Sequence, residues 1–374
     1  MGKGKDAGRG GEAEFRRDEK IIPAYVLLDG LNSSTEKPDL KDLTLSELQS
    51  RLEAEGEPKY RAGQVFEWVY QRGATEFAAL TDLPKGLRRT LEDRFSLILP
   101  DLGEHRVSGD RAEKFLFRLA DGAFIETVLI PAGARQTLCL STQVGCRFGC
   151  GFCASGMGGF QRHLRPSEII GQILFLRDRL SVPLTNFVFM GMGEPLDNFD
   201  NLARAILIMN AAEGLGIAAR RITVSTAGVI PGIERLKELK LQVSLSLSLH
   251  AVDDELRSKL MPINRKYPLA GVLRACQDYV RASGRMMTIE YILLRGLNDS
   301  VSDARRLGAI AARLKAKVNL IPYSEACGPA YEPSPAGQRE LFLRALERMN
   351  VSATLRRSRG ADIQAACGQL AGRK

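Results

Sequence analysis

The chain has 374 residues, which is enough for two or three domains of ordinary size. Hydrophobic residues make up 44% of it and charged residues 26%, a balance that excludes a wholly disordered protein and supplies a core. Lys and Arg outnumber Asp and Glu by 53 to 44, and the net charge of +9 suits a polyanionic partner without requiring one. The sequence has no apolar run of about 18 residues and no apolar stretch near its start, so we expect a cytoplasmic protein with no membrane association.

The first segments predict a tail and a helical module. Residues 1–22 mix glycine with charges of both signs, and we expect them to form a disordered tail. Within residues 23–105, helical spacing of apolar residues between about 40 and 98 predicts three helices. Thr44 and Glu47 fit a capping box at the first helix, and Pro84 suits the start of the last. Basic and aromatic residues alternate here, which favours a packed accessory domain or an RNA-binding one.

Residues 106–135 contain a hairpin signal. Two β-rich runs within residues 114–130 flank Asp121-Gly122, a dipeptide typical of a tight turn between antiparallel strands. We therefore expect a β-hairpin connector.

Residues 136–374 alternate between strands and helices. Strands are predicted near 137–142, 186–190, 221–226, 243–249, 286–294 and 316–321. Helices are predicted near 167–181, 199–212, 231–239, 268–283 and 301–315, followed by a helix near 335–349 and a strand near 351–357. Six strand–helix units imply a parallel sheet, because each crossover between parallel strands needs a helix. Both an open doubly wound α/β sheet and a partial barrel fit this pattern.

The cysteines carry the strongest chemical signal. Three of the seven, Cys146, Cys150 and Cys153, fall within eight residues just after the first core strand. Intervening glycines indicate a loop, so chance clustering of core cysteines is disfavoured. Three thiolates can bind one metal centre and leave a coordination position open, whereas structural zinc sites use four ligands.

This cysteine run resembles that of the radical S-adenosylmethionine (SAM) superfamily. The resemblance implies a partial (βα)6 TIM-like barrel, with the three cysteines on a four-iron–four-sulfur cluster. It also implies that SAM binds the fourth iron and is cleaved to a 5′-deoxyadenosyl radical. The sequence GMGEP at the end of the next strand is similar to the family's glycine-rich SAM motif, and it assigns Gly193 and Glu194 to SAM. Further candidate SAM contacts follow later strands, where barrel folds place their sites: Ser225, Ser248, Leu249, His250 and Ser324. Family members often carry Asn in place of Ser324, and Ser has a shorter reach.

The wider sequence resembles the RlmN-type methyltransferases, which methylate carbon 2 of an adenine in 23S ribosomal RNA. The resemblance rests on TLCLSTQVGC, GMGEPLDN, SLSLHA, MPINRKY and RGADIQAACGQL, and covers most of residues 40–370. It implies that Cys367 accepts a methyl group from one SAM and that a second SAM supplies a radical, so that two are used per turnover. The S-methyl radical would add to the adenine, Glu126 would remove the ring proton, and Cys139 would release the product by forming a transient disulfide.

The resemblance also implies partners. We expect 23S rRNA as substrate, an external flavodoxin-like electron donor and a monomeric enzyme, and the sequence leaves open whether tRNA is a second substrate. Arg356, Arg357 and Arg359 are candidate RNA contacts, with a solvated surface as the alternative. Two other functions remain: Cfr-like methylation of carbon 8 of the same adenine, and a non-catalytic, zinc-containing RNA-binding protein.

Overall fold

The computed structural model describes residues 37–177, 179–180, 183–324 and 331–372. The tail predicted for residues 1–22 and the cysteine at position 327 lie outside these residues. Among the described residues, no helix is long and apolar enough to cross a membrane.

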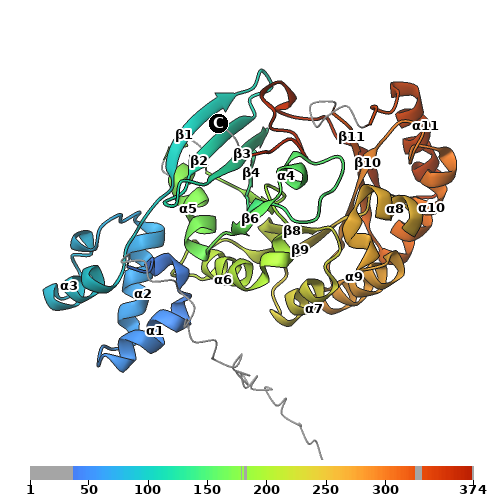
Figure 1. Cartoon of the computed structure of the whole chain (residues 1–374). Helices are drawn as coiled ribbons and strands as arrows, with labels where there is room; N and C mark the ends of the chain where they lie inside the picture. Colours follow the sequence, from blue (N-terminus) through green and yellow to red (C-terminus); the bar gives the residue numbers. More distant parts are fainter. Residues whose placement is uncertain (1–36, 178, 181–182, 325–330, 373–374) are drawn as a thin grey trace, which may run out of the picture. The chain divides into compact units, whose positions relative to one another are not determined.

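The first described elements are helical (Figure 1). They are α1 (Leu45–Ala54), α2 (Tyr60–Phe66), the π-helix η2 (Glu67–Gln71) and α3 (Lys85–Arg94), with 3-10 turns η1 (Leu40–Asp42) and η3 (Phe77–Ala79). The predicted capping box is confirmed, because the Thr44 side chain accepts from the Glu47 amide and Glu47 accepts from the Thr44 amide. Apolar residues one turn apart, such as Leu48 and Leu52, are buried between these helices.

An antiparallel extension follows. It consists of β1 (Asp101–Val107), β2 (Glu113–Arg118), β3 (Phe124–Ala132) and β4 (Arg135–Cys139). The predicted hairpin is confirmed as β2 and β3, which pair in antiparallel register across the Asp121-Gly122 turn. Strand β1 was not predicted and overlaps the end of the expected helical region. Its side chains are almost all exposed, so it has no alternating apolar pattern and is held by its pairing with β2.

The predicted parallel strands are confirmed. They are β7 (Asn186–Phe189), β8 (Ile222–Thr226), β9 (Ser244–Ser248), β10 (Thr288–Leu293), β11 (Lys317–Pro322) and β12 (Ala353–Leu355). Together with the extension they form one ten-stranded sheet in the order β1-β2-β3-β4-β7-β8-β9-β10-β11-β12, which is parallel from β4 onward. A separate two-stranded sheet pairs β5 (Gln143–Gly145) with β6 (Phe160–His163).

Helices flank the parallel strands (Figure 1). They are α5 (Pro166–Arg177), η4 (Pro195–Asn198), α6 (Phe199–Asn210), η5 (Ala219–Arg221), α7 (Ile230–Glu238), α8 (Asp254–Leu260), η6 (Pro262–Arg265), α9 (Leu269–Ser283), α10 (Val301–Leu314) and α11 (Ala336–Glu347). Short helices also lie at α4 (Ala154–Met157) and η8 (Ala361–Ile363). The six strand–helix units form a partial barrel, as the resemblance implied. Helix α8 was not predicted, because it has only seven residues.

Candidate functional site

A cavity lies where the parallel strands end, and most of the predicted site residues line it. The cavity is lined by these nine of them: Cys146, Cys150, Cys153, Gly193, Glu194, Ser225, Ser248, His250 and Cys367. They come from the cysteine loop, from the ends of consecutive strands and from the last residues of the chain. Four predicted residues lie outside this lining: Cys139, Glu126, Leu249 and Ser324.

The cysteine loop begins where β5 ends. Gly145 has a φ of +74°, and a Cβ there would lie 1.8 Å from the carbonyl oxygen of Gly159, so only glycine fits. The amide of Cys146 donates to that same carbonyl at 2.9 Å. Further along the loop, the amide of Gly151 donates to Leu260 at the end of α8 at 3.1 Å. Backbone hydrogen bonds therefore hold the loop at both ends.

The three thiols suit a cluster better than a single ion. Burial raises the pKa of Cys146 to about 12 and raises that of Cys150 well above its ordinary value, and each is raised further by its neighbouring acidic groups. A metal centre would supply the positive charge that ionises them. Among the described residues, no three Cys, His, Asp or Glu side chains are gathered closely enough to bind one ion. Structural zinc needs four ligands, whereas a four-iron cluster can be held by three cysteines that each bind a different iron.

The GMGEP turn faces the cysteine loop. Gly193 has a φ of +94°, and a Cβ there would lie 2.4 Å from the Cβ of Gln143. The Glu194 carboxylate is buried and accepts from the amides of Leu196 at 3.2 Å and Ala227 at 2.8 Å. Burial raises the pKa of Glu194 to about 7, and those hydrogen bonds oppose the rise. The turn thus presents a carboxylate whose charge an ammonium group would stabilise.

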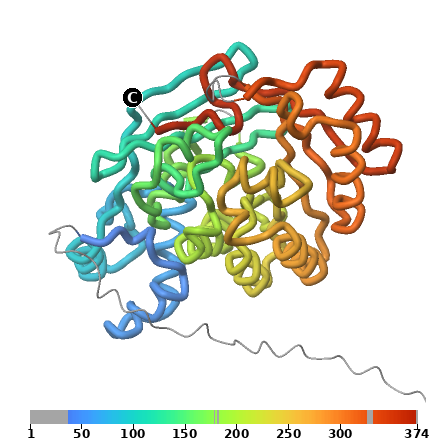
Figure 2. The backbone as a smooth tube through the Cα atoms, turned by 45° about the vertical axis from the view of Figure 1, so that its right-hand side comes forward, coloured from blue at the N-terminus to red at the C-terminus, as the bar shows by residue number. Residues whose placement is uncertain are grey.

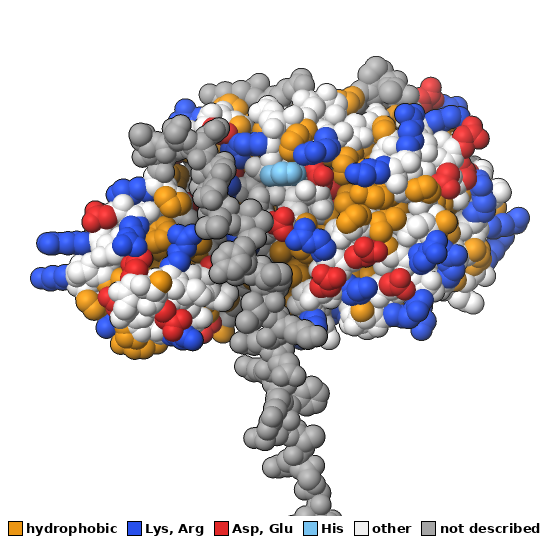
Figure 3. Space-filling view, turned by 60° about the horizontal axis from the view of Figure 1, so that its bottom comes forward, with side chains coloured by type: hydrophobic (Ala, Val, Ile, Leu, Met, Phe, Trp, Pro, Cys, Tyr) orange, Lys and Arg blue, Asp and Glu red, His pale blue; other side chains and the backbone are white. Residues whose placement is uncertain are grey.

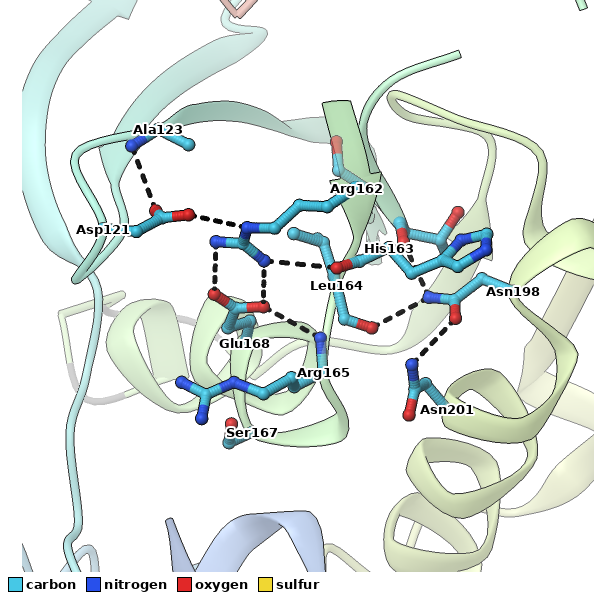
Figure 4. A network of polar contacts seen from close by, with 12 residues as sticks. Asp121, Ala123, Arg162, His163, Leu164, Arg165, Ser167, Glu168, Asn198 and Asn201 are labelled. Atoms are coloured by element: carbon cyan, nitrogen blue, oxygen red, sulfur yellow. Dashed lines mark hydrogen bonds and ion pairs between the residues drawn. The ribbon is translucent and has the colours of Figure 1, made fainter. Parts of the chain in front are cut away.

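Two buried amide side chains brace this turn against the neighbouring strands. Gln143 accepts from the Glu194 amide at 2.8 Å through Oε1 and donates to Asp197 at 2.8 Å through Nε2. Asn198 donates to the carbonyls of Thr142 and Leu164, both at 2.8 Å (Figure 4).

Arg162 lies beside this brace and ties three elements together. It makes two hydrogen bonds to Glu168 on α5, at 2.8 and 2.9 Å, and one to Asp121 in the β2–β3 turn at 2.6 Å (Figure 4). The hairpin is thereby joined to the part of the molecule that carries the cysteine loop.

Polar side chains from β8 and β9 complete this side of the cavity. The hydroxyl oxygens of Ser225 and Ser248 lie 3.4 Å apart. Burial lowers the pKa of His250 to about 3, so its ring is neutral. Its Nδ1 accepts from the amide of Ile292 at 3.1 Å, which places the ring proton on Nε2. His250 is therefore a neutral residue lining the cavity, and none of the described residues accepts from its remaining ring N–H.

The chain's last turn places Cys367 in the lining of the cavity. Figure 2 shows this terminal segment running beside the antiparallel extension. Its carbonyls accept from residues just after the cysteine loop: Gly368 from the Ala154 amide at 2.7 Å and Leu370 from the Ser155 hydroxyl at 2.5 Å. Cys367 is exposed by surface area, but that surface faces the recessed cavity, and burial among protein groups raises its pKa.

Cys139, Glu126 and Lys114 share one face of the sheet beneath this segment. Val128 on β3 pairs with both Cys139 and Lys114, and Glu126 lies two residues from it on the same face. Glu126 is buried, with one oxygen 2.8 Å from the Lys114 ammonium and the other accepting from the amides of Ala371 and Gly372, at 2.6 and 3.0 Å.

Cys139 is a buried free thiol near Cys367. Burial raises the pKa of Cys139 to about 12, and the Cys367 thiol, close enough for its charge to act, raises it further. Cys139 is held in β4 between β3 and β7.

The remaining predicted contacts are engaged within the protein. Ser324 accepts from Gln369 at 2.8 Å, so it braces the terminal segment. Leu249 is fully buried, and its amide and carbonyl bond Glu290 and Arg257.

The three candidate RNA contacts differ in whether their guanidinium groups are engaged within the protein. Arg356 lies 3.7 Å from Glu290, and Arg359 donates to the carbonyl of Pro131 at 2.8 Å, so both guanidinium groups bind within the protein. Arg357 is exposed, as an RNA contact would be.

The structure adds four residues that the sequence analysis missed: Lys114, Gln143, Arg257 and Glu290. Glu290 lines the cavity and is buried, and among the described residues its Oε2 has no hydrogen-bond partner, with the Arg356 guanidinium 3.7 Å away. The sequence did contain a signal for Glu290, because a carboxylate inside the apolar strand run TIEYIL needs a specific reason to be buried. The other three gave no signal, because their partners are remote in sequence or are backbone atoms.

Comparisons with known proteins agree with this architecture. Residues 140–307 match the model of the radical SAM superfamily, and residues 38–97 match that of the ribosomal RNA large subunit methyltransferase N-terminal domain. The chain is 48% identical to the dual-specificity RNA methyltransferase RlmN of Geobacter sulfurreducens, over 90% of this chain and 92% of that protein. It is 44% identical to a probable RlmN of Heliobacterium modesticaldum, over 92% of each chain.

A solved structure is similar throughout. The crystal structure of a radical SAM methyltransferase from Sphaerobacter thermophilus matches with a TM-score of 0.84 and 43% identity, over 90% of this chain and all of that one. High identity along nearly the whole length, together with a cavity that brings the cysteine loop and Cys367 together, shows that the chain belongs to the RlmN family of radical SAM methyltransferases.

Proposed function

We propose that the chain methylates carbon 2 of an adenine in 23S rRNA, and of an adenine in tRNA, through a methylated cysteine and a transient protein–RNA adduct. The observation that carries this proposal is that Cys367 and the three clustered cysteines line one cavity. Relatives that bear the name dual-specificity RNA methyltransferase support two RNA substrates. Carbon 2 of adenine is not nucleophilic, so direct methyl transfer from SAM would fail there, and a radical route through a protein thiol avoids that barrier.

As a member of the radical SAM family, the chain uses a four-iron–four-sulfur cluster and SAM. Cys146, Cys150 and Cys153 would hold the cluster, and Glu194, Ser225, Ser248 and His250 would hold SAM. When bound, the cluster supplies the electron that cleaves SAM and so starts the radical reaction. The carboxylate of Glu194 suits the SAM ammonium, and the neutral His250 offers a ring donor without adding charge.

Cys367 would take part twice. Its thiolate first takes the methyl group of one SAM, forming an S–CH3 bond as the sulfonium bond breaks. A hydrogen atom of this methyl group would pass to the 5′-deoxyadenosyl radical that the second SAM supplies, and the carbon radical left on Cys367 would bond to carbon 2 of the adenine. The adduct radical must then lose one electron, for which the cluster would be the acceptor, together with the proton on carbon 2. Cys139 would release the product: its thiolate attacks the sulfur of Cys367, a disulfide forms, and the sulfur–carbon bond breaks toward the RNA, which takes up a proton. An external thiol reductant must then reduce the disulfide.

Glu126 would take the proton from carbon 2 of the adduct. Its partner Lys114 lies 2.8 Å from one carboxylate oxygen and fixes the position of the carboxyl group. The amides of Ala371 and Gly372 occupy one of its oxygens in this structure, so the terminal segment must shift before that oxygen can act on the adduct.

RNA binding would draw on the helical module and on exposed arginines such as Arg357. On the face shown in Figure 3, Lys and Arg are interspersed with Asp and Glu, so the positive charge does not form one continuous patch there. We place the RNA instead over the mouth of the cavity, where the target adenine would have to leave its stack to reach Cys367.

Nucleoside mass spectrometry tests the proposal. The protein is reconstituted anaerobically, supplied with SAM and a reductant, and incubated with protein-free 23S rRNA or tRNA. We expect 2-methyladenosine. A product of 8-methyladenosine would assign the chain the Cfr-like reaction, and no methylated adenosine from a cluster-loaded protein would refute the proposed substrate.

A further inference from the structure

Three basic side chains are buried in the part of the chain that the structure describes: Lys41, Lys114 and Arg257. Two of them have a carboxylate partner in direct contact. Lys41 lies 2.9 Å from Asp39, and Lys114 lies 2.8 Å from Glu126. Arg257 is fully buried, yet within the described residues it has no carboxylate within ion-pair distance. A buried charge without a counterion is costly, so this exception needs an explanation.

The hydrogen bonds of Arg257 all go to neutral acceptors. Its Nε donates to the carbonyl of Leu249 at 3.1 Å. Nη2 donates to the carbonyls of Ala227 at 2.6 Å and Ser248 at 3.3 Å, and Nη1 donates to the side chain of Asn264 at 2.7 Å. The guanidinium thus joins the residues that follow β8 and β9, but these dipoles do not cancel its charge.

The charge persists at neutral pH. Burial lowers the pKa of Arg257 to about 10, which leaves the group protonated. The nearby acid Asp254 is exposed and is bridged to Arg257 only through Asn264, whose amide donates to Asp254 at 2.8 Å. Arg257 is therefore a buried cation that no carboxylate of the described residues contacts directly.

Helix α8, which carries Arg257, packs against the cysteine loop. The carbonyl of Leu260, at the end of this helix, accepts from the amide of Gly151, between Cys150 and Cys153. The next residue, Met261, lines the cavity together with all three cysteines. The Arg257 guanidinium itself donates to the carbonyls of Ala227 and Ser248, and both of these residues line the same cavity.

We infer that Arg257 is the buried countercharge of the iron–sulfur centre and that it raises the reduction potential of this centre. This inference rests on the proposed assignment of the three cysteines as cluster ligands. A cluster bound by three thiolates is anionic, and each added electron makes it more so. A fixed cation nearby stabilises the reduced form more than the oxidised form, and net local charge is one of the factors that set such potentials. Arg257 is a positioning and electrostatic residue here, not a catalytic one.

An arginine fits this role for two reasons. It keeps its charge when buried, whereas a buried lysine loses its proton more readily. Its several donors also hold the carbonyls of Ala227 and Ser248, whose residues line the SAM side of the cavity. One side chain can therefore carry the charge and shape the strand ends.

The test is a potentiometric titration of the reconstituted holoenzyme without RNA, with dithionite as reductant and electron paramagnetic resonance as the readout. Arg257→Gln and Arg257→Met both remove the charge, one with a polar and one with an apolar side chain, so that one can serve if the other fails to fold. We expect each to lower the ratio of reduced to oxidised cluster at a set potential at least tenfold, about 59 mV for one electron.

Two further variants separate charge from structure. Arg257→Lys loses hydrogen bonds and leaves a buried ammonium that deprotonates more readily, so we expect its potential to lie near that of the wild type at low pH and to fall toward that of Arg257→Met as the pH rises. Lys259→Gln removes an exposed charge from the same helix, where Lys259 pairs with Glu255 at 2.7 Å, and we expect no shift. An unchanged potential in the folded neutral variants, or an equal fall in Arg257→Lys at low pH, would overturn the inference. Iron and sulfide content tests the cluster assignment separately, so its failure would be seen before any titration.

Discussion

The two sides of the cavity are built in different ways. The cluster side uses a short loop and the ends of consecutive strands, and backbone hydrogen bonds such as that from Cys146 to Gly159 hold it. The Cys367 side is the end of the chain, and it is held by residues more than 200 positions away. Ser155 donates to Leu370, Ser108 donates to Asp362 at 2.6 Å, and Glu126 accepts from the Ala371 amide. The cluster side is therefore part of the barrel itself, whereas the Cys367 side is a terminal segment docked onto the barrel.

This difference suits the proposed reaction. A cluster and SAM need constant geometry, because electron transfer and bond cleavage depend on it. The thiol of Cys367 must meet a SAM methyl group, then the adenine, then Cys139, and no single position serves all three. The terminal segment is held by side-chain contacts at several points, and these contacts can break and re-form while the barrel stays folded.

The largest effect is expected on the cluster side. Cys150→Ala removes one of three ligands, so we expect loss of the cluster and of all RNA methylation, measured as iron content and methylated adenosine. Cys276→Ala is the matched control, because Cys276 is a cysteine that lies buried in α9 and does not line the cavity. Full methylation by Cys150→Ala would contradict the assignment of the loop.

On the Cys367 side, Glu126→Gln should separate the steps. The amide can still accept from Ala371 but cannot take a proton, so we expect RNA methylation to fall by about 100- to 10,000-fold. Methylation of Cys367 itself should continue, which peptide mass spectrometry can show. An unchanged rate of RNA methylation would remove Glu126 from the reaction.

Lys114→Met should affect stability as well as activity. It leaves the Glu126 carboxylate buried without its countercharge, and we expect the free energy of unfolding to fall by about 3–5 kcal/mol. Urea denaturation followed by circular dichroism measures it. The double variant Lys114→Met, Glu126→Leu should recover part of the loss; if it is less stable than Lys114→Met, the pair is not the cause.

A smaller effect is expected on the rates at which Cys139, in β4, and Cys367, in the terminal segment, are alkylated. Cys139 is 7% exposed and has a pKa of about 12, raised by burial, whereas Cys367 is exposed to the cavity. In the holoenzyme without SAM, iodoacetamide at pH 8 should therefore modify Cys367 first, as peptide mapping can show. Because the pKa of Cys139 lies well above pH 8, its thiolate fraction is small and grows with pH. Its rate of alkylation should therefore rise about tenfold per pH unit. Equal rates at pH 8 would contradict the placement of the two thiols.

The same contrast explains what the sequence could predict. The strand–helix alternation, the cysteine loop and the GMGEP turn are local patterns, and the structure places them as expected. Strand β1 escaped prediction because it is exposed on both faces and depends on pairing alone. Lys114 and Arg257 were not predicted, because their roles depend on partners that only the folded chain brings near. These partners are Glu126 for Lys114 and the strand-end carbonyls for Arg257. The assignment of Ser324 to SAM stays a prediction, and in the structure its hydroxyl accepts from Gln369.

Trapping of the RNA adduct tests the central claim most directly. In Cys139→Ala, the methylated Cys367 can still add to the adenine, but no thiolate remains to break the sulfur–carbon bond. The account predicts a covalent protein–RNA species that survives denaturing electrophoresis and maps by peptide mass spectrometry to Cys367. Free RNA with normal methylation by this variant would contradict the two-thiol reaction, and with it the role assigned to the docked segment.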